Sequence, residues 1–191
     1  MLARHFKPSL LKQIAESAGT PVYVYSEAVF LKQIASYKKA FRSLDPLFCY
    51  AMKSNSSGAL CGLAAGEGWG ADVVSGGELY RALKAGFEPG KLIFSGVGKT
   101  PDELEYALKT GVLFINAESF EEVLELERAA ARLKVRAPLS LRINPDVDPH
   151  THKYITTGKL GSKFGVTSGE ALKIYLYAAE SEHLKPVGAQ F

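Results

Sequence analysis

A lysine ends an apolar run in Phe48-Cys49-Tyr50-Ala51-Met52-Lys53-Ser54-Asn55, and a small polar loop comes after it. In parallel α/β proteins, ligands bind at the carboxyl ends of the strands. A lysine held there against apolar neighbours would be partly desolvated, which favours the neutral amine that Schiff-base chemistry needs. Lys53 is therefore a candidate nucleophile. The alternative for any lone lysine is a surface position, with its stem along an apolar rim.

Polar residues also accompany the later apolar runs. Asp72 and the segment 75–77 cluster around the end of the next run, the segments 95–99 and 116–119 follow the third and fourth, and Arg142 ends the fifth. If these runs are neighbouring parallel strands, one rim gathers a lysine, an acid, an arginine and several backbone amides. The Arg142 fork suits phosphate or carboxylate, and glycine amides suit phosphate. Each glycine alone more often marks a turn.

Seven short apolar runs predict the strands that would position these residues. The runs cover residues 22–25, 47–52, 71–74, 92–94, 112–115, 139–143 and 187–191. They are rich in Val, Ile, Leu, Phe and Tyr. Short strands that are apolar on both faces are typical of parallel sheets, which are covered on both sides.

Helix-start signals lie between the strands. Ser75, Thr100, Ser119 and Thr167 are each followed three residues later by Glu, which is the capping-box pattern. Strand and helix therefore alternate, which predicts an α/β fold with a parallel sheet. An open doubly wound sheet and a TIM-type (β/α)8 barrel both fit. From residue 47 the chain offers about six strands, too few to close an eight-stranded barrel, so we expect an incomplete barrel and a fragment.

The first part of the chain has a different pattern. Residues 9–18 and 27–41 predict amphipathic helices on either side of the expected strand 22–25. We therefore expect two parts: an N-terminal lead-in over residues 1–46 and a partial (β/α) barrel over residues 47–191, truncated at the sixth strand.

Composition excludes several classes of protein. The chain has 191 residues, 47% hydrophobic and 23% charged, with 23 basic and 20 acidic side chains spread along its length. This balance argues against disorder, a nucleic-acid face and a membrane span. Cys49 and Cys61 form no disulfide framework or metal motif, and His150 with His152 gives only weak metal spacing. We expect no metal and, without a secretory signal, a cytoplasmic location.

Several motifs together resemble one known family. They are Tyr50-Ala51-Met52-Lys53-Ser54-Asn55, Ala71-Asp72-Val73-Val74-Ser75-Gly76-Gly77-Glu78-Leu79, Phe94-Ser95-Gly96-Val97-Gly98-Lys99-Thr100 and Leu141-Arg142-Ile143-Asn144-Pro145. They resemble the pyridoxal-phosphate-dependent decarboxylases of fold type III, which have an alanine racemase-like barrel. Within that group, residues 150–158 and 162–165 are similar to the diaminopimelate decarboxylases. The resemblance covers nearly the whole chain but only the first half of the family's length.

The resemblance implies a function for the parent enzyme. This is decarboxylation of meso-diaminopimelate, a diamino dicarboxylic acid, to L-lysine and CO₂. Lys53 matches the lysine that holds pyridoxal 5'-phosphate as a Schiff base, Asp72 matches an acid near it, and Arg142 matches an arginine lining the cofactor pocket. A homodimer is implied as well. The lead-in would join a C-terminal β-domain that lies beyond Phe191.

Other readings stay open at the level of sequence. An ornithine- or arginine-type decarboxylase of the same fold is the nearest one, and a racemase is a weaker one. A non-catalytic fragment that binds pyridoxal phosphate or another protein is a further alternative. Because an open barrel has unpaired edges and an uncovered interior, we expect the 191 residues alone to be inactive and poorly soluble.

Overall fold

The computed structural model describes residues 6–145 and 164–191. The motif at 150–158, with His150 and His152, lies outside the described residues. The chain forms two compact units, Met1–Pro46 and Leu47–Phe191, and each is described by itself.

The first unit contains two helices, α1 (Pro8–Ala18) and α2 (Glu27–Ala40). Both helices were expected, and α2 begins where the Ser26 hydroxyl accepts the Val29 N–H at 3.4 Å. The expected strand at 22–25 is wrong, because these residues have no strand assignment and Tyr23 is 89% exposed. An apolar run forms a strand only when a neighbouring strand accepts its backbone hydrogen bonds, and no described residue pairs with this one.

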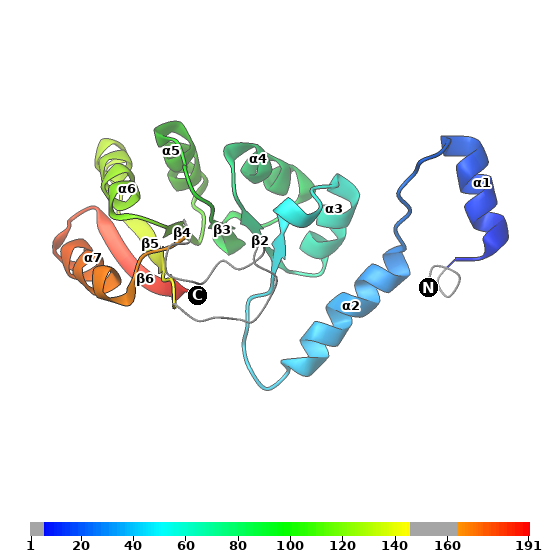
Figure 1. Ribbon diagram of the computed structural model, residues 1–191, viewed down its shortest axis with the longest axis horizontal. Helices are drawn as coiled ribbons and strands as arrows, with labels where there is room; N and C mark the ends of the chain where they lie inside the picture. Colours follow the sequence, from blue (N-terminus) through cyan, green and yellow to red (C-terminus); the bar gives the residue numbers. More distant parts are fainter. Residues whose placement is uncertain (1–5, 146–163) are drawn as a thin grey trace. The chain divides into compact units, whose positions relative to one another are not determined.

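The second unit is one parallel sheet in which strand order follows chain order (Figure 1). Its strands are β1 (Cys49–Ala51), β2 (Gly70–Val73), β3 (Leu92–Phe94), β4 (Phe114–Ala117), β5 (Ala137–Arg142) and β6 (Leu184–Gln190). A doubly wound sheet reverses its strand order at a switch point. The sequential order therefore excludes that alternative and leaves the barrel-type fold.

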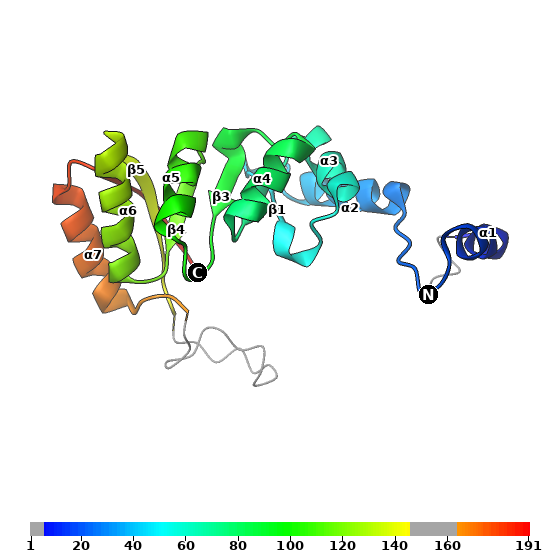
Figure 2. The same ribbon diagram turned by 90° about the horizontal axis from the view of Figure 1, so that it is seen from above.

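Helices connect successive strands along one face of the sheet (Figure 2). They are α3 (Gly58–Gly66), α4 (Gly76–Ala85), α5 (Pro101–Thr110), α6 (Phe120–Leu133) and α7 (Ser168–Glu180), with short 3₁₀ turns η2 (Met52–Ser54) and η3 (Pro89–Lys91). Thr100 and Thr167 make the expected reciprocal capping boxes. At Ser75 and Ser119 the hydroxyl caps as expected, but the glutamate reaches the backbone N–H of the residue before the cap.

The two faces of the sheet differ in chemistry. Side chains toward the helices are apolar and fully buried: Ala71, Val73, Leu92, Phe94, Ile115, Ala117, Leu139 and Leu141. The register sets Asp72 beside Ile93 and Asn116 beside Ser140 on the opposite face. In a barrel this second face is the interior, because side chains alternate along each strand. The apolar core therefore lies between sheet and helices, and the polar residues collect inside.

Candidate active site

Lys53 lies in η2, two residues beyond the end of β1. The residue before it, Met52, is fully buried, whereas Lys53 itself is exposed. The expected desolvation of Lys53 is therefore absent from the structure. Its cause is local: β1 ends at Ala51, whose carbonyl accepts the Ser54 hydroxyl at 2.7 Å, and this tight turn directs Met52 rather than Lys53 into the core.

Asp72 lies within β2 on the interior face, directly beside Ala51 of β1. One of its carboxylate oxygens, Oδ1, is buried and has no hydrogen-bond partner among the described residues. Because β1 and β2 are adjacent and parallel, Lys53 and Asp72 come from neighbouring strands near the same end of the sheet. The structure thus brings an acid and a lysine to one part of the rim.

Arg142 ends β5 on the same face, opposite Gln190 of β6. Its Nη1 donates to both carboxylate oxygens of Glu118, at 3.2 and 3.1 Å. The Phe164 ring lies against the guanidinium, with 4.6 Å between Cζ and the ring centroid. Arg142 is therefore already fixed by a carboxylate and an aromatic face. The expectation of a cation at this rim is met, but this cation is paired.

A cavity of about 270 Å³ opens on the interior face. Its lining residues come from five strands: Asp72, Ile93, Phe114, Asn116, Ser140, Ala189 and Gln190. Three buried oxygens there lack a donor among the described residues: Oδ1 of Asp72, Oδ1 of Asn116 and Oε1 of Gln190. Buried acceptors of this kind require donors. An aromatic cofactor that carries a protonated ring nitrogen and a phosphate fits this chemistry, because the face offers acceptors and its rim offers an arginine.

Two of the glycines expected to bind phosphate, Gly76 and Gly96, have structural roles. The Gly76 N–H donates to Oε1 of Glu103 at 2.8 Å, which links α4 to α5. Gly96 has φ 92°, and a Cβ there would lie 3.1 Å from Cβ of Val74, so glycine is required by both conformation and space. At the end of the segment 95–99, which follows β3, the Lys99 side chain is 1% exposed. Its ammonium donates to the Gly96 and Asn116 carbonyls and to the Glu122 carboxylate.

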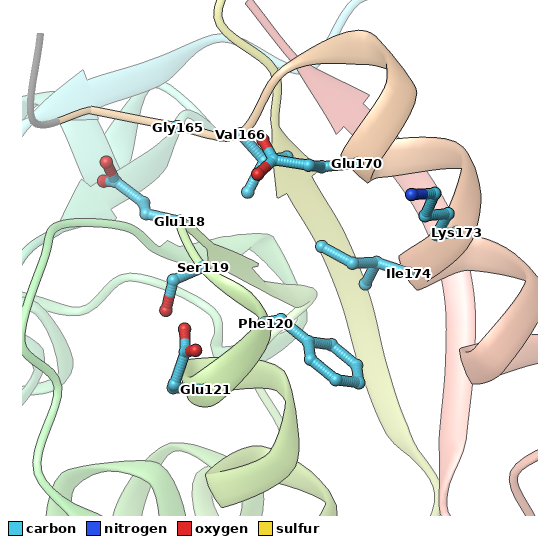
Figure 3. Close-up of a pocket in the computed structure, with 9 residues that line it drawn as sticks. All are labelled: Glu118, Ser119, Phe120, Glu121, Gly165, Val166, Glu170, Lys173 and Ile174. Carbon is cyan, nitrogen blue, oxygen red and sulfur yellow. The ribbon is translucent and has the colours of Figure 1, made fainter. Parts of the chain in front are cut away.

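Sequence reasoning missed Glu118 as a functional residue, although it lay in the polar segment 116–119. It lies one residue beyond β4, and its side chain is 4% exposed. A second cavity, of about 470 Å³, lies where α6 and α7 begin, and Glu118 lines it (Figure 3). In that view the Glu118 carboxylate points away from Phe120 and Ile174. One signal in the sequence could have indicated this pair: Glu118 comes directly after one strand, and Arg142 ends the next.

Both cysteines are free thiols. Burial raises the pKa of Cys49 to about 11, and the nearby charge of Asp72 adds to the effect. Burial also raises the pKa of Cys61. Within 6–145 and 164–191, no group of three or more His, Cys, Asp or Glu could hold a metal ion. None of the helices in those ranges is long and apolar enough to cross a membrane.

The sequential parallel sheet, its single helical layer and the polar rim define a protein of the parallel α/β barrel class. Residues 27–191 match the family described as "Pyridoxal-dependent decarboxylase, pyridoxal binding domain", and the chain belongs to this family. It is 48% identical, over 92% of its length, to diaminopimelate decarboxylase from Neisseria meningitidis serogroup B. It is 49% identical, over 93% of its length, to the same enzyme from Pseudomonas aeruginosa.

A solved structure shows the same relationship. Diaminopimelate decarboxylase from Helicobacter pylori, complexed with L-lysine, superposes with a TM-score of 0.91 at 44% identity over 94% of this chain. The chain spans less than half of these relatives: 42% and 43% of the two enzymes and 45% of the solved chain. The comparisons confirm the expected family and the barrel-type fold.

Proposed function

We propose that the protein containing this chain decarboxylates meso-diaminopimelate to L-lysine and CO₂ with pyridoxal 5'-phosphate. One observation carries the proposal. In a chain 48% identical to a diaminopimelate decarboxylase, Lys53 follows β1, Asp72 lies within β2 and Arg142 ends β5, and the interior face is lined with buried acceptor oxygens. The nearest alternative, a decarboxylase for ornithine or arginine, has less support, because the similar enzymes reported above are diaminopimelate decarboxylases.

Three residues would hold the cofactor and orient the substrate. Lys53 would form the covalent link, and its exposed position leaves its amine accessible to the cofactor aldehyde. Asp72 would place a negative charge near that link and so favour a protonated nitrogen there. Arg142 would bind an anionic oxygen group through its guanidinium. When bound, pyridoxal phosphate supplies the electron sink that decarboxylation of an amino acid needs.

The test replaces the lysine that would hold the cofactor. In the protein containing this chain, Lys53→Ala should abolish the absorbance of lysine-bound pyridoxal phosphate and reduce decarboxylation by at least about 10³-fold, since the covalent step is lost. Borohydride reduction followed by peptide mapping should attach the cofactor to Lys53 in the unmodified protein. Lys109→Ala, at an exposed lysine of α5, is the matched control and should leave both readouts unchanged.

Substrate profiling completes the test. Turnover of meso-diaminopimelate well above that of ornithine or arginine is expected, and the reverse order would transfer the proposal to the related decarboxylases. Cofactor attached to Lys53 without turnover of any diamino acid would instead indicate a non-catalytic binding protein. A homodimer and a cytoplasmic location are part of the proposal and are tested by sedimentation and by cell fractionation.

A further inference from the structure

Glu118 differs from the acidic residues around it because it is buried and paired. Its side chain is 4% exposed, and its partner Arg142 is 26% exposed. A carboxylate withdrawn from water needs a cation or several donors to compensate. Both of its oxygens accept hydrogen bonds from Nη1 of Arg142. The pair therefore joins the end of β4 to the end of β5 at the rim of the interior.

The Glu118 backbone is held by a second buried pair. Its N–H donates to Oε2 of Glu122 at 3.0 Å, and the other oxygen of Glu122 binds the buried ammonium of Lys99. Lys99 also binds the carbonyl of Asn116, two residues before Glu118. The position of Glu118 is thus set by contacts on both sides of it. Because Glu118 is held in place, its carboxylate can hold the Arg142 side chain that it binds.

Contacts with residues 6–145 and 164–191 leave part of the Arg142 guanidinium available. Glu118 uses Nη1 only, and Phe164 covers one face of the guanidinium. Nε and Nη2 take no part in this ion pair, and together they form an edge that matches the two oxygens of a phosphate or carboxylate. A flexible arginine would lose rotamer entropy on binding such a group, whereas a fixed one loses less.

We propose that Glu118 is a positioning residue that, with the Phe164 ring, holds the Arg142 guanidinium so that its Nε and Nη2 edge binds an anionic oxygen group of the cofactor or the substrate. The inference rests on the proposed function and extends it, because it assigns a role to a residue that does not itself touch either molecule. The cofactor offers a phosphate and the substrate offers carboxylates, and the experiment separates these two sources.

The experiment compares Glu118→Gln with Glu121→Gln in the protein containing this chain. Glu121 is an exposed acid three residues after Glu118, and it lines the same second cavity. Its substitution therefore controls for the loss of one negative charge near this position. Two constants are measured: the dissociation constant of pyridoxal phosphate, and KM for meso-diaminopimelate at saturating cofactor. Glu118→Gln should raise one of them about tenfold, within the range for directly coupled residues, whereas Glu121→Gln should change neither by more than about twofold. A change in the first constant identifies phosphate, and a change in the second identifies carboxylate.

A double-mutant cycle shows whether Glu118 acts through Arg142. If it does, Glu118→Gln combined with Arg142→Ala should be no worse than Arg142→Ala alone. Two effects that multiply would overturn the proposal, as would two unchanged constants. Glu118→Asp keeps the charge and should restore part of the loss. If Glu118→Gln does not fold, the same cycle is run with Phe164→Leu, which keeps both charges and should shift the same constant in the same direction by a smaller factor.

A readout that needs neither cofactor nor turnover separates this inference from the proposed function. Phenylglyoxal modifies arginine, and Arg142 in the cofactor-free protein should react slowly because a carboxylate and an aromatic ring restrain it. Glu118→Gln should accelerate the modification of Arg142 several-fold, measured by peptide mapping, with Arg128 on α6 as an internal reference. An unchanged rate would show that Glu118 does not restrain Arg142, even in an active enzyme. A faster rate in a protein without decarboxylase activity would support the positioning role and reject the proposed reaction.

Discussion

Cys49 shows at the scale of one residue how the interior face acts on a side chain. It pairs with Gly70, two residues before the Ala51–Asp72 pair, so it shares the face that carries Asp72. Burial raises its pKa to about 11, above the usual 9.0, and the charge of Asp72 contributes in the same direction. The neutral thiol is therefore the stable form of Cys49 in the folded protein.

Alkylation kinetics test this effect. Because only the thiolate reacts, the iodoacetamide rate of Cys49 should be half its maximum near pH 11, whereas a thiol with the usual pKa is at half its maximum near pH 9.0. Asp72→Asn removes the charge and should move that rise to lower pH. The sign for stability follows: the contribution of the neutral thiol is complete below pH 9.0 and is lost as the pH rises toward 11. A half-maximal rate of Cys49 near pH 9 would contradict the assignment.

The site could be predicted from sequence only as far as residue type and strand position allow. Asp72 and Arg142 occupy the rim positions expected of them, because the apolar runs locate the strand ends. The exposure of Lys53 was not predictable, since it depends on how η2 turns. The pairing of Glu118 with Arg142 depends on the register between β4 and β5, and short apolar strands do not reveal register. The roles given to Lys53, Asp72 and Arg142 stay predictions.

At the scale of elements, the helix starts allow a matched comparison. Glu103 and Glu170 make the same capping box at α5 and α7. Glu103 also accepts the Gly76 N–H at 2.8 Å, which ties the start of α4 to the start of α5. The pKa of Glu103 is lowered first by this bond and then by the Thr100 N–H. Glu103 thus supports two helices and Glu170 supports one.

Glu103→Gln should therefore destabilise the protein more than Glu170→Gln. The extra loss, the bond from Gly76 to a charged acceptor, is expected to be about 1 kcal/mol, measured by urea unfolding at pH 7. Because the pKa of Glu103 lies below 4.5 in the folded protein, its contribution is present above that pH and declines as the pH falls through the lowered value. Equal effects of the two substitutions would show that the Gly76 bond is not stabilising.

The elements themselves were largely predictable. The runs at 47–52, 71–74, 92–94, 112–115 and 139–143 each overlap a strand of the sheet. The sixth strand begins at Leu184, three residues earlier than expected, because Lys185 and Pro186 interrupt its apolar pattern. Such residues are tolerated in an edge strand. The run at 22–25 failed for the opposite reason: its residues are apolar, but strand formation also requires a partner.

At the scale of the whole molecule, the six-stranded sheet has two edges, β1 and β6. Residues 185–189 of β6 are exposed, and Val187 is 44% exposed. An exposed edge strand offers free backbone groups to other chains. We therefore expect the 191-residue chain to associate through β6 as its concentration rises.

A charge on that edge should reduce the association. Val187→Lys is expected to lower light scattering at a given concentration at least severalfold, since edge lysines block strand pairing. Leu172→Lys is the control, because it adds the same charge at a residue of α7 that is 63% exposed and lies off the sheet. If both substitutions lower scattering equally, net charge rather than the edge governs solubility.

The alternation between the two faces of the sheet also constrains how this sequence can change over time. Asn116 faces the interior and its neighbour Ala117 faces the helices, where it is fully buried. Inserting one codon before Asn116 would exchange the two faces for the rest of β4, placing an amide among apolar side chains and removing it from the interior. Substitutions can therefore alter the chemistry of the interior one residue at a time, whereas single-codon insertions and deletions should be tolerated between the elements but eliminated within the strands.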